Sequence, residues 1–161
     1  IYGTPKRLPI NETFPVNCQS PYAASKAAAD QLALSYFKSF NLPIKLIRPF
    51  NTYGPRQSNR AIIPTIISQC LQNKKKEIIL GNINPTRDMN YVEDICAAFY
   101  EVYKSKKTIG KVLNVGSNTN ISIKNLAKKI MKIMKVKYKI RLSSLRDRPK
   151  ISDVDNLKCA N

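Results

Sequence analysis

One tyrosine and one lysine in this sequence have a spacing that could support proton transfer. Tyr22 and Lys26 are four residues apart in the segment SPYAASK at 20–26, so on a helix both lie on one face, about one turn apart. A nearby ammonium stabilises a phenolate, and a tyrosine in that setting can act as a general acid or base near neutral pH. The same spacing is common on ordinary amphipathic helices, so its meaning depends on the segments around it.

The surrounding residues predict a long helix that carries this pair. Ser20-Pro21 is a typical helix start, alanines fill the next turns, and apolar residues recur at helical spacing as far as Phe37. Asn41 and Pro43 end the pattern. We therefore expect a helix over residues 21–40.

Helical and strand-like segments alternate after this helix, which predicts a parallel α/β sheet. The expected elements are strand 43–49, helix 61–73, strand 77–81, helix 93–106, strand 111–116, helix 123–134 and strand 138–142. Residues 4–20 contain three prolines and should form a surface loop with Glu12 in solvent. Ligands bind at the carboxyl ends of parallel strands, so we expect loop 50–56 to lie at a ligand site. The alternative is that this loop is only a turn, in which Asn51 and Gly54 provide the backbone geometry.

The composition fits one globular domain with a basic surface. The chain has 161 residues, 43% of them hydrophobic, and a formal net charge of +18, with four scattered cysteines and no histidine. The scattered cysteines and the lack of histidine argue against a metal site. Scattered thiols, with no secretory signal and no membrane span in the sequence, favour a location in the cytoplasm. The charge raises a nucleic-acid hypothesis, but dispersed lysines and the lack of a recognisable binding motif favour an enzyme for anionic ligands, without a nucleic-acid or membrane partner.

Five separated motifs resemble one enzyme family. In chain order they are Tyr22-x-x-x-Lys26, RPFNTYGP at 48–55, RDMNYVED at 87–94, LNVG at 113–116 and Arg148-Pro149. Their order and spacing resemble the NAD-dependent epimerase/dehydratase enzymes, which are extended short-chain dehydrogenase/reductases that act on nucleotide sugars. Within that family, residues 48–58 and 61–69 are most similar to nucleotide-activated N-acetylglucosamine 4,6-dehydratases of legionaminic-acid-type synthesis.

The resemblance implies an α/β fold, namely the C-terminal half of a Rossmann-type doubly wound parallel sheet plus a small α/β substrate-binding part. Residues 1–60 would belong to the dinucleotide-binding part and residues 61–161 mainly to the substrate-binding part, with strand 111–116 returning to the Rossmann sheet. Family members begin with a Gly-x-x-Gly-x-x-Gly turn that holds the NAD pyrophosphate, and the five glycines here lack that spacing. We therefore expect a fragment of a longer enzyme.

The resemblance also implies roles for particular residues. Tyr22 would remove the proton of the sugar C4 hydroxyl, and Lys26 would hold the nicotinamide ribose and keep Tyr22 acidic. The implied contacts with the cofactor, NAD rather than NADP, are made by Tyr22, Lys26, Pro49, Phe50 and Asn51. The implied substrate-binding residues are Asn51, Arg87, Asn114 and Arg148. Asp88 and Asp94 should be structural, the first beside a cation and the second at helix-end amides.

The implied substrate is a nucleotide-diphosphate sugar, and the implied reaction is 4,6-dehydration, in which water is lost after oxidation at C4. A 4-epimerase or a decarboxylase of the same family remains an alternative, because the residues that choose among these outcomes precede Ile1 in the family. A truncated remnant without catalysis is a further alternative. The helix that carries Tyr22 would form a homodimer interface.

Overall fold

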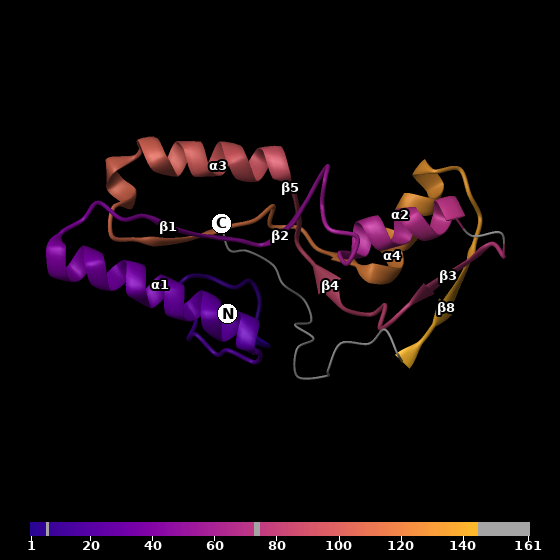
Figure 1. Ribbon diagram of the computed structural model, residues 1–161, viewed down its shortest axis with the longest axis horizontal. Helices are drawn as coiled ribbons and strands as arrows, with labels where there is room; N and C mark the ends of the chain where they lie inside the picture. Colours follow the sequence, from indigo (N-terminus) through magenta and orange to yellow (C-terminus); the bar gives the residue numbers. More distant parts are fainter. Residues whose placement is uncertain (6, 73–74, 145–161) are drawn as a thin grey trace.

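The computed structural model describes residues 1–5, 7–72 and 75–144, and its main elements form two groups at opposite ends of an elongated molecule (Figure 1). The first group consists of α1 (Pro21–Phe40), β1 (Leu46–Pro49), α3 (Val92–Lys104) and β6 (Val112–Val115). The second group consists of α2 (Ile62–Gln72), β3 (Glu77–Leu80), α4 (Ile123–Ile133) and β8 (Lys139–Leu142). The remaining short elements are β2 (Asn51–Tyr53), β4 (Thr86–Arg87), β5 (Met89–Tyr91), η1 (Lys106–Thr108) and β7 (Ile121–Ser122).

The strands pair two by two, and the longer pairs are parallel. β1 pairs with β6, β2 with β5 and β3 with β8 in parallel, whereas β4 and β7 are antiparallel. Helices α1 and α3 lie on opposite sides of the β1–β6 pair (Figure 1). Parallel strands need crossover connections, and helices lie within the connections of all three parallel pairs. The predicted α/β class is confirmed.

Helix α1 has the bounds that the sequence predicts. The Ser20 hydroxyl accepts a hydrogen bond from the Ala23 N–H over 3.1 Å, and Pro21 follows in the first turn. Asn41 ends the helix in the left-handed conformation, with a φ of 55°. No residue of α1 is buried, and Leu32 is exposed. Tertiary packing within the described residues therefore covers little of this helix.

Two contacts fix α1 and α3 to the strands between them. Gly110 has a φ of +73°, and a Cβ atom at this position would collide with the ring of Phe37 on α1, so the turn before β6 lies directly against that helix. The ammonium of Lys45 donates to the carbonyl oxygens of Val102, over 3.0 Å, and Tyr103 at the end of α3. The negative end of the helix dipole favours a cation there.

The hydrophobic core lies in the second group. Its buried members come from α2, β3 and α4: Ile66, Cys70, Ile78, Leu80, Ile123, Leu126, Ala127, Ile130 and Met131. The opposite face of α4 exposes lysines at 124, 128 and 132, as its amphipathic pattern predicts. Ser122 caps this helix by accepting from the Asn125 N–H over 3.2 Å. Burial also raises the pKa of the Cys70 thiol.

Two local expectations were incomplete. Loop 50–56 contains strand β2, which pairs with β5 and was not predicted, because three residues are too few to show a strand pattern. Helix α3 has Tyr91 as its N-cap without a side-chain hydrogen bond, and Asp94 lies in its first turn, where the helix dipole favours a negative charge. Among the helices of the described ranges, none is both long and apolar enough to cross a membrane.

Candidate functional site

Tyr22 and Lys26 lie together on an open face of α1. The Lys26 Nζ atom is 5.6 Å from the centroid of the Tyr22 ring, which is within cation–π range. Tyr22 is 72% exposed and Lys26 is exposed as well. The hydroxyl of one and the ammonium of the other are therefore open to a ligand with hydroxyl groups, such as the ribose of a dinucleotide.

The chain leaving β1 carries the next three predicted cofactor contacts. Pro49 ends the strand and is exposed, and the Phe50 N–H donates to the carbonyl of Val115 over 2.9 Å. The side-chain Nδ2 of Asn51 is buried and has no hydrogen-bond partner among the described residues. A buried donor without a partner costs about 1–3 kcal/mol. Asn51 is thus placed to donate to a ligand that brings its own acceptor.

A pocket of about 490 Å³ brings together Asn51 and Arg87, two of the predicted substrate-binding residues. Gln57 and Arg60 add polar groups to its wall, and none of the described residues that line it is acidic. Its apolar side chains include Ile62, Ile63, Ile79, Leu80 and Met89. Two guanidinium groups beside an apolar wall suit a ligand that combines a phosphate with a flat apolar ring.

Arg87 is held at the end of β4. The strand pairs with β7, with Arg87 opposite Ile121, and the Arg87 Nη1 atom donates to the carbonyl of Thr86 over 2.8 Å. The side chain is half-buried and lines the pocket. Its backbone and one nitrogen are therefore fixed before a ligand arrives.

The neighbouring Asp88 is fully buried, and the expectation that it pairs with a cation is wrong. Its Oδ1 atom accepts from the N–H and the hydroxyl of Ser117, over 3.1 and 2.6 Å, and from the Asn90 amide over 3.1 Å. Its Oδ2 atom accepts from the Asn118 N–H over 3.1 Å. Several neutral donors stabilise a buried carboxylate without a counter-charge. Asp88 thereby ties the loop after β6 to β5.

Asn114 makes internal contacts at the centre of β6. Its Oδ1 atom accepts from the Tyr2 hydroxyl over 2.8 Å, and its backbone N–H donates to Glu12 over 2.6 Å. Its Nδ2 atom is buried without a partner in the described part of the chain. Asn114 does not line the pocket of Asn51 and Arg87, so its substrate contact stays a prediction. Glu12 is exposed in its loop, as expected, and its carboxylate also accepts the Asn114 N–H at the edge of β6.

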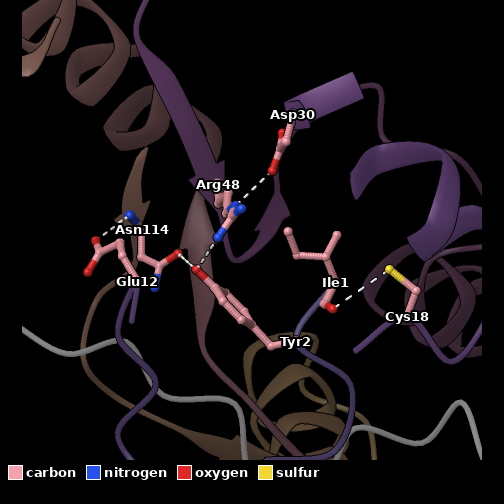
Figure 2. Close-up of polar contacts among 7 residues, drawn as sticks. All are labelled: Ile1, Tyr2, Glu12, Cys18, Asp30, Arg48 and Asn114. Atoms are coloured by element: carbon pink, nitrogen blue, oxygen red, sulfur yellow. Dashed lines mark hydrogen bonds and ion pairs between the residues drawn. The ribbon is translucent and has the colours of Figure 1, made fainter. Parts of the chain in front are cut away.

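Arg48 joins this contact to α1 in a network that sequence reasoning missed (Figure 2). Its Nε atom is 2.8 Å from Asp30 Oδ2, and its Nη1 atom donates to the Tyr2 hydroxyl over 2.6 Å. Burial disfavours the charge of Arg48, but the hydrogen bonds to Asp30 and Tyr2 outweigh this and raise its pKa. One signal was present in the sequence: Arg48 directly follows Leu46 and Ile47 in a short strand, and buried charges are normally paired.

The structure thus brings only two of the predicted residues in the described ranges, Asn51 and Arg87, into one pocket. Tyr22, Lys26, Pro49 and Phe50 are not among the residues that line the pocket of about 490 Å³. Arg148 lies outside the described residues. Within the described ranges, no group of three or more Cys, Asp or Glu side chains is placed to hold a metal ion.

Comparison with known proteins relates this arrangement to a family. The sequence model of the family GDP-mannose 4,6 dehydratase matches residues 1–158. A dTDP-D-glucose 4,6-dehydratase of Dictyostelium discoideum is 44% identical over 123 residues, which make up 76% of this chain and 28% of that protein.

Two solved structures are similar over nearly the whole chain. A dTDP-glucose 4,6-dehydratase from Bacillus anthracis, in complex with NAD, has a TM-score of 0.83 and 30% identity and covers 97% of this chain. A UDP-N-acetylglucosamine 4-epimerase from Methanobrevibacter ruminantium has a TM-score of 0.87 and 28% identity and covers 99%. The chain spans 50% of each of these two proteins. From the match over residues 1–158, the chain belongs to the GDP-mannose 4,6 dehydratase family of nucleotide-sugar dehydratases and epimerases.

Proposed function

We propose that the full-length protein is an NAD-dependent nucleotide-sugar 4,6-dehydratase. The observation that carries this proposal is the position of the Lys26 ammonium, 5.6 Å from the Tyr22 ring centroid on a helix face that is open to a ligand. A phenolate beside an ammonium is suited to removing a proton from a sugar hydroxyl. The family membership supports the C4 hydroxyl of a nucleotide sugar as the group on which Tyr22 would act.

Two residues of this chain have separate roles in the first step. Tyr22, as the phenolate, would accept the proton of the C4 hydroxyl, and the Lys26 ammonium beside it would hydrogen-bond a ribose hydroxyl of the cofactor. NAD, when bound, supplies the oxidising capacity for the sugar carbon. The open Tyr22–Lys26 face and the unpartnered amide of Asn51 both fit such a ligand.

The pocket beyond β1 binds the nucleotide diphosphate in this proposal. Arg87 and Arg60 provide positive charge, and guanidinium groups hold phosphate oxygens in pairs. The unpartnered Nδ2 atom of Asn51, which also lines this pocket, would donate to a phosphate or sugar oxygen. The isoleucine and leucine side chains of α2 and β3 pack against the base. Substrate binding therefore draws on residues that are separate from the proton-transfer pair.

The homodimer is the second part of the proposal. Leu32, Tyr36 and Phe40 are large apolar side chains that remain exposed along α1. A continuous apolar stripe on a surface helix is typical of an interface with another helix. A second copy of the same helix is a suitable partner, because a two-fold axis places the same stripe on both subunits.

A 4-epimerase is the alternative within the same family. It is favoured by the similarity of the described fold to the UDP-N-acetylglucosamine 4-epimerase from Methanobrevibacter ruminantium, with a TM-score of 0.87. An epimerase uses the same proton transfer at C4 but does not eliminate water. The described residues serve both reactions equally.

Mass spectrometry and NMR spectroscopy of the reaction products together separate these functions, because mass reports the loss of water and NMR reports the configuration at C4. The full-length protein would be incubated with NAD and, in turn, with dTDP-glucose, UDP-glucose, GDP-mannose and UDP-N-acetylglucosamine. A product lighter by one water identifies a dehydratase, and a product of unchanged mass with inverted C4 identifies an epimerase. Failure to convert or bind any nucleotide sugar would contradict both, and a Tyr22→Phe variant controls for contaminating activity.

A further inference from the structure

We propose that Arg48 is a positioning residue that sets the rotation of α1 about its axis, and through it the direction in which Tyr22 and Lys26 point. This inference rests on the proposed function, because it assigns a task toward the same reaction. It adds Arg48 and Asp30 to the residues on which proton transfer depends, although neither touches the reacting atoms.

Asp30 connects the proton-transfer pair to the sheet. Tyr22, Lys26 and Asp30 follow one another at intervals of four residues, so all three side chains lie on one side of α1. The Asp30 carboxylate is 2.8 Å from the Arg48 Nε atom in β1. Holding Asp30 against β1 therefore also holds the side of the helix that carries the other two.

Helix α1 has few other contacts that could set its rotation. None of its residues is buried in the described structure, so apolar packing restrains it weakly. The ring of Phe37 lies against Gly110 near the end of the helix, more than three turns away from Tyr22. The Asp30–Arg48 pair is closer to Tyr22, and its side chains are only 16% and 12% exposed. Low exposure leaves the ion pair little screened by water and salt.

Arg48 is itself held rigidly by a chain of hydrogen bonds. Its Nη1 atom donates to the Tyr2 hydroxyl over 2.6 Å, and that hydroxyl donates to Asn114 Oδ1 over 2.8 Å. The Asn114 N–H is held in turn by Glu12, over 2.6 Å. Figure 2 shows these side chains meeting between β1, β6, α1 and the N-terminal segment. Because this guanidinium is hydrogen-bonded on two sides, it holds α1 in a fixed position relative to β1 and β6.

The test compares variants of the full-length protein with its NAD and whichever nucleotide sugar it converts. Arg48→Met and Asp30→Asn should each lower kcat about 100-fold, because a displacement of about 1 Å of a catalytic group has an effect of this size. The KM for the nucleotide sugar should stay unchanged, since the pocket of Arg87 is untouched. Arg48→Lys keeps the charge, so its kcat should be higher than that of Arg48→Met. It loses the two-sided contact, so its kcat should stay below that of the wild type.

Hydrogen exchange of the backbone amides at 22–30 provides a reading that does not depend on activity. Arg48→Met should raise the exchange rate in this segment, because α1 loses its contact with β1. The matched control is Arg141→Met, which breaks the Arg141–Glu77 ion pair (3.2 Å) between β8 and β3. That variant should change neither kcat nor exchange in α1.

The outcomes separate this inference from the proposed function. If Arg48→Met and Asp30→Asn keep the wild-type kcat while only the free energy of unfolding falls, Arg48 is merely structural and the inference is overturned. If the wild-type protein converts no nucleotide sugar, the proposed function fails, and unchanged exchange in α1 would separately refute the positioning role. If Arg48→Met does not fold, kcat and hydrogen exchange are measured on Asp30→Asn and Arg48→Lys instead.

Discussion

Ser117 donates both its backbone N–H and its hydroxyl to the buried carboxylate of Asp88, over 3.1 and 2.6 Å. The two residues are far apart in the sequence, but the contact joins the loop after β6 to the start of β5. Asp88 directly follows Arg87, so the same segment presents a guanidinium to the pocket and buries a carboxylate behind it. The buried acid thus anchors the strand that carries a predicted substrate-binding residue.

Replacing this acid should destabilise the protein. Asp88→Asn replaces one acceptor oxygen with an NH₂ group, which faces N–H and O–H donors and cannot accept from them. Each buried donor that is left without a partner lowers the free energy of unfolding by about 1–3 kcal/mol. Urea unfolding should show the loss in the free energy of unfolding. Glu93→Gln, at an exposed residue in the first turn of α3, is the control. Equal stability of the two variants would mean that Asp88 is not an anchor.

Removing the Tyr22 hydroxyl should abolish proton transfer. Tyr22→Phe keeps the ring under Lys26 but has no group to accept the C4 proton, so kcat should fall by about 100-fold or more. The nucleotide-sugar affinity, measured by calorimetry, should change little, because the pocket assigned to the nucleotide diphosphate does not include Tyr22. A wild-type kcat in this variant would remove Tyr22 from the catalytic step.

Removing the Arg87 guanidinium should weaken substrate binding. A hydrogen bond to a charged group is worth about 1.5–3 kcal/mol, so Arg87→Met should raise the dissociation constant of the nucleotide sugar about 10-fold to 100-fold. Arg56→Met is the matched control, since Arg56 lies in the same loop region as Arg60 but does not line this pocket. If both variants bind equally well, the pocket does not hold the diphosphate.

Core truncation should affect stability without involving the proton-transfer pair. Ile66 on α2 is fully buried in the core of the second group, and Ile66→Ala should lower the free energy of unfolding by about 2–5 kcal/mol. Ile133→Ala removes the same atoms from an exposed side chain of α4, so it should have little effect. Thermal unfolding of both variants measures the difference, and a similar loss in each would show that this core is not assembled as described.

Local structure was largely predictable from the residues. The helix of Tyr22 has the expected bounds because Ser20-Pro21 and Asn41 are strong start and stop signals. The helix at Ile123–Ile133 and its Ser122 cap follow from an amphipathic pattern and one hydroxyl. The four-residue spacing of Tyr22 and Lys26 likewise determines their contact within α1. These features depend on neighbours within one or two helical turns.

The sequence by itself determined the α/β class, the bounds of the helix that carries Tyr22, the Tyr22–Lys26 pair and, through five motifs, the family. Only the tertiary structure decided which distant residues meet. It joined Asn51 to Arg87 in one pocket, and Asp30 to Arg48 across α1 and β1. The reason is physical: side-chain periodicity reports which face of an element is apolar, whereas strand pairing and helix packing decide which buried polar groups find partners across the chain.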